Sequence, residues 1–257
     1  MLEIKNIYKT FNKGTVNEKK ALNGVSFTLN DGDFVTVIGG NGAGKSTTLN
    51  AVAGVWPVDS GSIIIDGINV TGLPEHKRAK YLGRVFQDPM TGTAATMEIQ
   101  ENLALAVRRG KRRGLRWGIT KKEREQFKEL LKQLDLGLEE RMTSKVGLLS
   151  GGQRQALTLL MATIQKPNLL LLDEHTAALD PKTAELIMEL TDKVVREKQL
   201  TTIMVTHNLR YAVEYGDRLL MMHQGHAVMD LEGDEKKNMN VDAILEKFNE
   251  ISIECGN

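Results

Sequence analysis

Hydrophobic and polar residues alternate along the first part of the chain. In residues 2–4 and 25–29 every second position is apolar, which is typical of antiparallel strands with one buried face. Residues 34–38 are almost continuously apolar, and such a run predicts a strand that is buried on both faces. The chain is therefore expected to begin with an antiparallel layer that precedes a buried strand.

Strands and helices alternate through most of the remaining chain. After a helix at 46–53 and strands at 63–65 and 82–86, the apolar spacing is helical over about 97–165. Beyond it the pattern predicts a strand at 169–172, a helix at 183–198, a strand at 202–206, a helix at 209–215 and a strand at 219–222. This order implies an α/β fold with a mixed or parallel core sheet, an N-terminal antiparallel β layer and an inserted helical subdomain.

A single domain is expected for the 257 residues, because no Gly-, Ser- or Pro-rich linker divides them. Within it we expect a β layer and core at about 1–90 and 166–232, a helical subdomain at about 91–165 and a tail at about 233–257. The apolar residues of the tail have helical spacing and predict a short amphipathic helix that packs on the core: Val241, Ile244, Leu245 and Phe248.

Composition and charge exclude several functional classes. Lys and Arg total 34 against 33 Asp and Glu, so no excess of positive charge favours nucleic acid, and no nucleic-acid partner is expected. No apolar run approaches the roughly 20 residues that span a bilayer, and the first residues lack the features of a signal peptide. The single cysteine, Cys255, excludes an internal disulfide. These features predict a cytosolic chain.

Residues 39–46 match a phosphate-binding loop, Gly-x-x-x-x-Gly-Lys-Ser, between a predicted buried strand and a predicted helix. Glycines allow the backbone to surround a phosphate, Lys45 can reach the β- and γ-phosphates of a nucleotide, and the hydroxyl of Ser46 can ligate Mg²⁺. We call residues 39–46 the phosphate loop. The nucleotide-contacting residues expected in and next to it are Gly39, Asn41, Gly42, Ala43, Gly44, Lys45, Ser46 and Thr47.

Acidic and imidazole side chains follow two other predicted strands. Asp173 ends a four-leucine strand, a position from which a carboxylate can hold Mg²⁺ beside a phosphate loop, commonly through water. Glu174 can polarise an attacking water. His207, which follows the strand at 202–206, can reach the γ-phosphate, because ligand sites of open α/β sheets gather at the carboxyl ends of the strands. The sequence therefore predicts hydrolysis of a nucleoside triphosphate.

A second anion-binding pattern, Leu-Ser-Gly-Gly-Gln at residues 149–153, precedes the acidic strand and is called the Ser150 loop below. A helix that begins with Ser-Gly-Gly offers backbone N–H groups to an anion. Because the phosphate loop already surrounds the phosphates on its own side, the Ser150 loop cannot easily serve the same nucleotide within one molecule. The simplest arrangement is two copies, head to tail, each of which completes the other's site.

In these motifs and their order the chain resembles the nucleotide-binding subunit of an ABC transporter, from about residue 1 to about residue 230. The resemblance implies that Phe11 stacks on adenine, with Tyr8 as the alternative. It implies that Gln87 senses Mg²⁺ and water and moves with a transmembrane partner. It also implies that the Ser150 loop meets the γ-phosphate bound to the opposite copy and that Asp180 contacts that copy at the dimer seam.

Residue chemistry and the resemblance together assign three sets of residues. The expected catalytic residues are Glu174, His207, Lys45 and Gln87. The expected metal-binding residues are Ser46, Gln87 and Asp173. The expected ATP-contacting residues outside the phosphate loop are Phe11, Ser150, Gly151, Gly152, Gln153 and Asp180.

The resemblance implies an ATPase that uses ATP and Mg²⁺ and dimerises around two Mg-ATP. Such a subunit powers solute uptake through separate membrane permease subunits at the cytoplasmic face of the membrane, together with an extracytoplasmic solute-binding protein. ATPases of exporters and of lipoprotein-release systems carry the same catalytic residues, and soluble ABC ATPases without a membrane partner are a further alternative. The partner distinguishes these classes. The sequence of this subunit does not identify the cargo.

One position departs from the family pattern. Members usually have proline after the catalytic glutamate, where this chain has His175. Proline fixes φ at about −65° and lacks an N–H, so histidine loosens this turn and adds a donor, and ATPase activity is expected to survive. Either the change is neutral, or His175 tunes hydrolysis or contacts at the seam.

Two further segments bear on partners. Residues 173–180 and 206–212 are together similar to a subgroup of these ATPases that is associated with solute-binding proteins for aromatic amino acids or related small molecules. The basic run at 108–117 is either a solvated loop or a contact with anionic lipid or an acidic partner surface.

Overall fold

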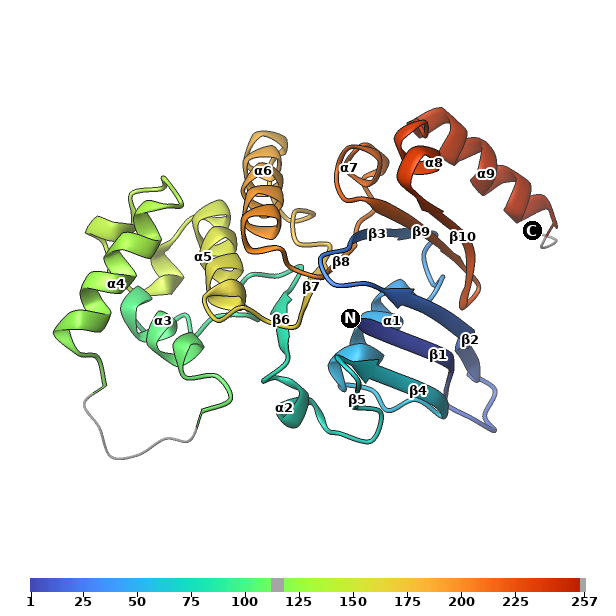
Figure 1. Ribbon diagram of the computed structural model, residues 1–257, viewed down its shortest axis with the longest axis horizontal. Helices are drawn as coiled ribbons and strands as arrows, with labels where there is room; N and C mark the ends of the chain where they lie inside the picture. The colour runs from blue at the N-terminus through green and yellow to red at the C-terminus, as the bar shows by residue number, and fades with distance from the viewer. Residues whose placement is uncertain (112–117, 255–257) are drawn as a thin grey trace.

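The computed structural model describes residues 1–111 and 118–254, and these residues form two sheets with surrounding helices (Figure 1). The first sheet is antiparallel and has the strand order β2-β1-β4-β5. Its strands are β1 Leu2–Phe11, β2 Lys19–Leu29, β4 Ser60–Ile65 and β5 Ile68–Asn69. The predicted N-terminal antiparallel layer is therefore present.

The second sheet has the strand order β10-β9-β3-β8-β7-β6. Strands β9, β3, β8, β7 and β6 run parallel, and β10 pairs antiparallel with β9 at one edge. The α/β class with a mixed core sheet is thereby confirmed. In sheet order the bounds are β10 His226–Glu232, β9 Arg218–His223, β3 Phe34–Gly39, β8 Thr202–Val205, β7 Leu169–Asp173 and β6 Leu82–Val85.

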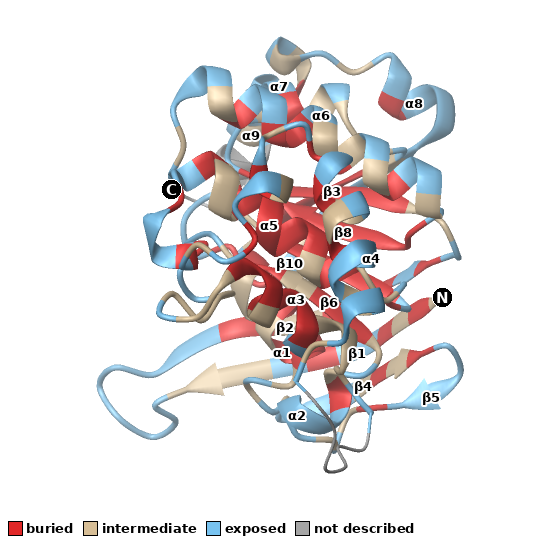
Figure 2. Cartoon of the chain, turned by 90° about the vertical axis from the view of Figure 1, so that its left-hand side faces the viewer, coloured by how far each residue is buried: buried red, intermediate tan, exposed pale blue. Residues whose placement is uncertain are grey.

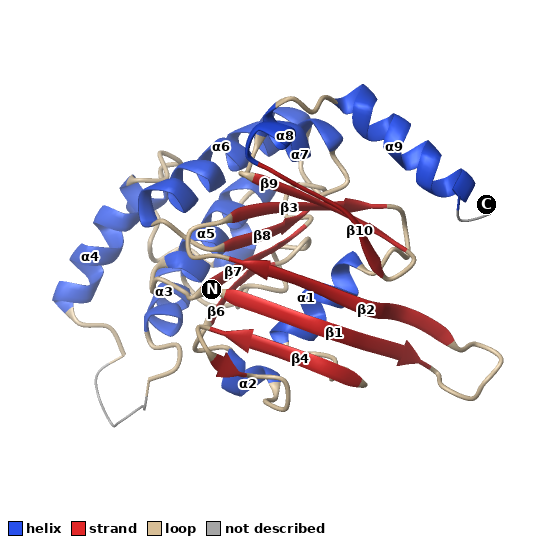
Figure 3. Ribbon diagram, turned by 45° about the vertical axis from the view of Figure 1, so that its right-hand side comes forward, coloured by secondary structure: helices blue, strands red, loops and turns tan. Residues whose placement is uncertain are grey.

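Helices connect the strands of the second sheet and cover it (Figure 3). The helices before the strand β7 are α1 Lys45–Ala53, α2 Glu75–Arg78, α3 Ile99–Val107, α4 Lys121–Lys132, α5 Gly151–Thr163 and the short 3₁₀ turns Leu138–Glu140 and Val146–Leu148. Those after it are α6 Pro181–Lys198, α7 Leu209–Glu214, α8 Gly233–Lys237 and α9 Val241–Glu254.

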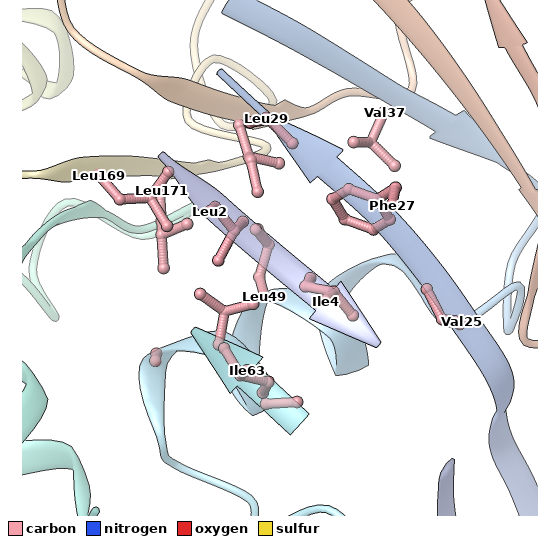
Figure 4. Packing of buried hydrophobic residues seen from close by; sticks show 14 of the residues in the cluster. Leu2, Ile4, Val25, Phe27, Leu29, Val37, Leu49, Ile63, Leu169 and Leu171 are labelled. Carbon is pink, nitrogen blue, oxygen red and sulfur yellow. The ribbon is translucent and has the colours of Figure 1, made fainter. Parts of the chain in front are cut away.

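Apolar residues of β7 alternate between two cores. Leu169 and Leu171 pack with side chains of β1, β2 and α1 (Figure 4), whereas Leu170 and Leu172 pack with side chains of α5 and α6. Because both faces are buried, the four leucines show no alternation with polar residues. Buried residues accordingly run through both sheets, while the covering helices keep exposed faces (Figure 2). The layers thus fix the carboxyl end of β7, where Asp173 and Glu174 lie.

A separate apolar cluster joins α3, α4 and α5. Ile99 and Leu103 of α3 pack in it with Phe127 of α4 and Leu157 of α5, and Ile187 of α6 closes one side. The N-terminus of α4 is fixed by a capping box in which Thr120 and Glu123 satisfy each other's backbone N–H groups. These helices therefore form a packed unit that carries the Ser150 loop at the start of α5.

The tail helix is present, but only part of its predicted apolar face is buried. Ile244 packs with Ala212 and Leu219, and Phe248 packs against the same cluster, while Leu245 is 46% exposed. The apolar spacing did not predict the strand β10, because this edge strand has exposed and half-buried residues in alternation and none that is fully buried.

A buried arginine closes the far end of α1, the helix that follows the phosphate loop. Arg78 is 1% exposed, and its guanidinium donates to the carbonyls of Ala51 and Val52 in the last turn of α1 and to those of Thr71 and Leu73. Burial lowers the pKa of Arg78 from its usual value. A cation suits this position, because the C-terminal carbonyls of a helix carry partial negative charge.

Candidate functional site

Backbone geometry explains two glycines of the phosphate loop. Gly39 has φ 151°, and a Cβ there would lie 2.2 Å from the carbonyl oxygen of Met222 on the neighbouring strand β9. Gly44 has φ 102° and precedes α1, and its Cβ would lie 2.7 Å from the carbonyl oxygen of Ala21. A side chain at either position would collide with backbone, so the turn from β3 into α1 requires glycine.

Lys45 lies at the centre of this turn. Its Nζ donates to the carbonyl oxygens of Gly39 at 2.8 Å and Gly40 at 3.0 Å, and the residue is almost fully buried. Burial lowers the pKa of Lys45 from its usual value, while the charges of Glu174 and Asp173 oppose that shift. The ammonium is therefore held next to the loop backbone and next to two carboxylates.

Oxygen ligands suitable for Mg²⁺ meet beside this lysine. The hydroxyl of Ser46 donates to Oδ1 of Asp173 at 3.3 Å. Hydroxyl and carboxylate oxygens fit Mg²⁺, which proteins usually bind through one or two such groups together with water and substrate phosphates. Residues 1–111 and 118–254 contain no group of three or more His, Cys, Asp or Glu side chains that could hold a metal by themselves. A metal here would depend on the substrate's phosphates.

Asp173 also has a partner that the sequence did not indicate. The guanidinium of Arg84 on β6 lies 3.6 Å from Oδ2 of Asp173 and donates to Oδ1 of Asn50 in α1 at 2.7 Å. A charged residue inside the apolar strand at 82–86 was the signal that could have revealed it. Arg84 and Ser46 thus contact different oxygens of the Asp173 carboxylate and together restrict its orientation.

Glu174 and His207 form a close pair. Nε2 of His207 lies 2.7 Å from Oε1 of Glu174, and the backbone N–H of Glu174 donates to the carbonyl of Val205 at 3.0 Å. Glu174 has φ 49°, which is rare for a residue other than glycine and favours a role at a functional site. The turn after β7 therefore aims the carboxylate at the end of the neighbouring strand β8.

A cavity of about 220 Å³ brings most of these residues together. It is lined by Phe11, Lys19, Ala21, Asn41, Gly42, Ala43, Gly44, Lys45, Ser46, Thr47, Glu174 and His207. Two predicted metal residues meet at its wall, because Ser46 lines it and contacts Asp173. Lys19, from the second strand, is a lining residue that sequence reasoning missed. The cavity suits a nucleotide with its phosphates at the loop.

The aromatic side of this cavity is formed by Phe11 rather than by Tyr8. Phe11 lines the cavity and packs edge-to-face against Trp56, with ring centroids 4.9 Å apart. Tyr8 is 41% exposed and does not line it. Trp56 was not among the predicted site residues, and its contact fixes the orientation of the Phe11 ring.

Other predicted site residues do not line this cavity within the part of the chain that the structure describes. They are Gly39, Gln87, Ser150, Gly151, Gly152, Gln153, Asp173 and Asp180, of which Asp173 touches the lining residue Ser46. Gly39 instead holds Lys45 through its carbonyl, and Gln87 is exposed after the end of β6. Their assigned contacts with nucleotide and metal stay predictions.

The Ser150 loop has a local structural role. The hydroxyl of Ser150 accepts from the N–H of Gln153 at 3.2 Å, and the side chain of Gln153 accepts from the N–H of Ser150, which is a capping box at the start of α5. A Cβ on Gly152 would lie 2.3 Å from Cγ2 of Thr183 on α6. The side chain of Thr183 thus fills the space beside Gly152, so glycine here also serves the packing of α5 on α6.

Asp180 caps the start of α6. Its carboxylate accepts from the N–H of Thr183 at 3.1 Å, and Pro181 occupies the first helical position. The contact with Thr183 lowers the pKa of Asp180 from its usual value. The Ser150 loop and Asp180 therefore begin two helices that touch each other.

His175 is buried, with 2% of its surface exposed. Its Nε2 lies 3.1 Å from Oγ1 of Thr191 in α6. Burial lowers the pKa of His175 to about 4, so the imidazole is neutral near pH 7. The side chain does not reach the surface, which removes the alternative in which it contacts a second copy at the seam.

The basic run is only partly within the described residues, because 112–117 lie outside them. Arg108 pairs with Glu123 at 2.8 Å, and Arg109 is half-buried and donates to the carbonyls of Ala162 and Gln165. The contacts of these two arginines are with other residues of the helical region. Neither the interpretation as a solvated loop nor that as a lipid contact therefore describes Arg108 and Arg109.

The phosphate loop lies between β3 and α1, a carboxylate pair lies at the end of β7, and a histidine lies at the end of β8. This combination defines a P-loop nucleoside triphosphatase. A model of the ABC transporter family matches residues 22–177. The chain belongs to the ABC transporter family as an ATP-binding subunit, and it is an ATPase.

Individual relatives agree with this assignment. The chain is 48% identical over 248 residues to a tyrosine transport ATP-binding protein of Clostridioides difficile, covering 96% of this chain and 98% of that protein. It is 33% identical to the spermidine/putrescine import ATP-binding protein PotA of Haemophilus influenzae, covering 90% of this chain but only 57% of that protein.

A solved relative shares the fold. The ATP-binding cassette MJ0796, determined as a dimer in a post-hydrolysis state bound to ADP and Pi, superposes with a TM-score of 0.76 at 31% identity, covering 90% of this chain and 98% of that chain. Among the described residues of the present chain, no helix has the length and apolar character needed to cross a bilayer.

Proposed function

We propose that the chain is the ATP-hydrolysing subunit of an importer. Two copies bind two Mg-ATP head to tail and drive uptake of a small solute, of the class of aromatic amino acids, through separate permease subunits at the cytoplasmic face of the membrane. An extracytoplasmic solute-binding protein supplies the solute. The relative named for tyrosine transport, similar over almost its whole length, supports the solute class. The relative named for spermidine/putrescine import supports the direction.

The incomplete lining of the nucleotide cavity is the observation that supports the two-copy arrangement. One cavity is lined by the phosphate loop together with Phe11, Glu174 and His207. In the described part of the chain, the Ser150 loop does not line this cavity. Ser150 and Gly151 are exposed, and the backbone N–H groups at the start of a helix favour an anion. A second copy places its Ser150 loop against the open side of the cavity, as the dimeric state of the solved relative supports.

The residues of one copy then divide the chemistry. Lys45 neutralises charge on the β- and γ-phosphates, and Glu174 polarises the attacking water while His207 holds its carboxylate. Mg²⁺, held by Ser46 and Asp173 and sensed by Gln87, supplies further neutralisation of the phosphate charge when bound. Loss of the γ-phosphate removes contacts that hold two copies together, which favours their separation.

A groove at the end of β6 supports the proposed permease contact. It has a volume of about 380 Å³ and is lined by Arg84 of β6, by Gly92 and Ala94, and by residues of α3 and α5. Its lining is mainly apolar, with Leu105 37% exposed and Arg84 and Arg109 at its polar side. A permease segment in this groove would contact both the core, about 1–90 and 166–232, and the helical subdomain, about 91–165, which we propose transmits the change of nucleotide state to the permease.

Replacing Leu105 by aspartate is expected to abolish uptake, because a charge in the apolar wall opposes docking. Cells that carry the variant as their only copy should lose uptake of labelled tyrosine, while the purified subunit should bind ATP as the parent chain does. Val228→Asp, on the exposed edge strand β10, is the matched control and should leave uptake intact. Normal uptake with Leu105→Asp would contradict the groove assignment, and tyrosine uptake that never depends on this chain would contradict the solute class.

Ser150→Asp is expected to abolish ATP hydrolysis and preserve the fold. Aspartate caps a helix as well as serine does, but its charge repels a γ-phosphate. Steady-state turnover should fall by about 100-fold or more. The thermal unfolding midpoint and ATP binding to the cavity should remain as in the parent chain.

Mixing supplies the control for this variant. Ser150→Asp and Lys45→Ala chains are each inactive, but a mixed pair contains one cavity with an intact phosphate loop and an intact Ser150 loop. The mixture should therefore regain roughly a quarter of the parental rate, since half of the pairs are mixed and each has one complete site. Full activity of Ser150→Asp alone would be incompatible with a shared site.

A further inference from the structure

His175 joins the catalytic turn to the helix that the turn leads into. It follows Glu174 directly, and its ring is enclosed between the end of β7 and α6, where Nε2 lies 3.1 Å from Oγ1 of Thr191. Thr191 is in the interior of α6 and is fully buried. The side chain therefore spans from the first residue after Glu174 to the middle of α6.

The hydrogen-bond partners fix the direction of this contact. The hydroxyl of Thr191 has one proton and donates it to the carbonyl oxygen of Ile187 at 2.7 Å, because that oxygen can only accept. The same hydroxyl must then accept from His175, so Nε2 carries the proton. His175 is the donor in a contact that ends on the backbone of α6.

The segment held by this contact contains two proposed site residues. Glu174 adopts φ 49°, and its backbone is held by the bond from its N–H to Val205 and by the bond from Ala177 N–H to its carbonyl. Asp180, six residues later, begins α6. Leu179, near the end of this turn, packs against the apolar cluster that contains Ile187 of α6, whereas His175 ties the turn to α6 directly beside Glu174.

We propose that His175 is a positioning residue, which ties the Glu174–Asp180 turn to α6 through Thr191 and thereby holds the Glu174 carboxylate in its working orientation. The proposal rests on the proposed catalytic role of Glu174. It gives a physical basis to the alternative in which His175 tunes hydrolysis, since the imidazole supplies a hydrogen bond that a proline ring cannot.

Two variants remove the contact from either side. His175→Phe keeps a planar ring and removes the donor, and Thr191→Val keeps the shape and removes the acceptor. Each should lower kcat by roughly five- to tenfold and leave the KM for ATP unchanged, because ATP contacts other residues and one buried hydrogen bond is lost. The double variant should be no slower than the slower single variant, since both remove the same interaction.

Thr163→Val is the matched control for the threonine. Thr163 is also buried, lies in a helix and donates to the carbonyl four residues earlier, at 2.8 Å, but it is at the end of α5 and does not contact the catalytic turn. It should leave kcat unchanged. Thermal unfolding of all variants, followed without nucleotide, reports loss of stability separately from loss of turnover.

The outcomes separate the possible roles. If His175→Phe and Thr191→Val lower only the unfolding midpoint and turn over ATP at the parental kcat, His175 is a core residue and the proposal is wrong. If Thr163→Val slows catalysis equally, the effect is general to buried threonines and the proposal is also wrong. If Glu174→Gln, measured in parallel, keeps its turnover, then the catalytic assignment of Glu174 itself fails. Should His175→Phe not fold, Thr191→Val decides the question.

Discussion

The variant Glu174→Gln is expected to hydrolyse ATP about 100-fold or more slowly than the parent chain and to bind it as well. Glutamine has nearly the same shape and can still accept from His207, which lies 2.7 Å from the carboxylate. It has no negative charge with which to polarise water. Steady-state phosphate release and calorimetric titration with Mg-ATP measure the two quantities separately.

The same variant should accumulate as a pair. If ATP holds two copies together and hydrolysis releases them, a chain that binds but does not hydrolyse should elute as a dimer in the presence of Mg-ATP. Glu185→Gln is a suitable control, because Glu185 is an exposed carboxylate on α6 that pairs with Arg210. Turnover at the parental rate, or elution as a monomer with saturating ATP, would be evidence against the assignment.

Lys45→Ala is expected to weaken Mg-ATP binding by at least ~100-fold, because charge-assisted contacts with two phosphates are lost. The ammonium of Lys45 already lies against the carbonyls of Gly39 and Gly40, within the curve of the phosphate loop. Calorimetry gives the affinity directly. A ligand present at 100 times its Kd stabilises the folded state by about 2.7 kcal/mol, so the rise in unfolding midpoint with ATP should disappear in the variant.

Lys20→Ala tests whether any lysine near the first sheet has the same effect. Lys20 is exposed on β2, next to the cavity residue Lys19, and does not line the cavity. Its variant should bind Mg-ATP like the parent chain. If Lys45→Ala still bound Mg-ATP tightly, the assignment of residues 39–46 as the loop that binds the nucleotide phosphates would be wrong.

The sequence predicted the part of the site that is formed by contiguous residues and by the ends of neighbouring strands. The phosphate loop is contiguous, and the strand before it and the helix after it have distinct apolar patterns, so Lys45 and Ser46 could be assigned from spacing. Asp173 and His207 follow buried strands, and the carboxyl ends of parallel neighbouring strands meet at one edge of the sheet. Strand order alone therefore brings these distant residues together.

Contacts between elements were not predictable in the same way. Arg84 reaches Asp173 because β6 is next to β7, and Trp56 fixes the Phe11 ring because a loop folds over β1. The Trp56 contact has no sequence pattern of its own, and the charge of Arg84 within an apolar strand indicates a partner without identifying it as Asp173. The burial of His175 depends on how α6 packs across the sheet, which the residues around position 175 do not specify.

Gly152 illustrates a different limit, because one residue answers two requirements. Its place after Ser150 suggested anion binding, yet glycine also serves packing here, since a Cβ would lie 2.3 Å from Cγ2 of Thr183. Pattern recognition alone does not separate a glycine kept for a ligand from one kept for a neighbouring helix. The variant Ser150→Asp keeps the helix cap and the packing of Gly152, so it tests anion binding by the Ser150 loop separately from packing.

The contact between Gly152 and Thr183 also has a mechanical consequence. Because Gly152 has no side chain, the side chain of Thr183 on α6 packs directly against the backbone of α5, and the beginnings of the two helices form one packed corner with Ser150 on α5 and Asp180 on α6. In the proposed pair of copies, a displacement that withdraws one of these residues from the neighbouring copy is then expected to carry the other with it. Release of the two copies would then occur in a single concerted step, without a half-open stage in which one contact persists alone.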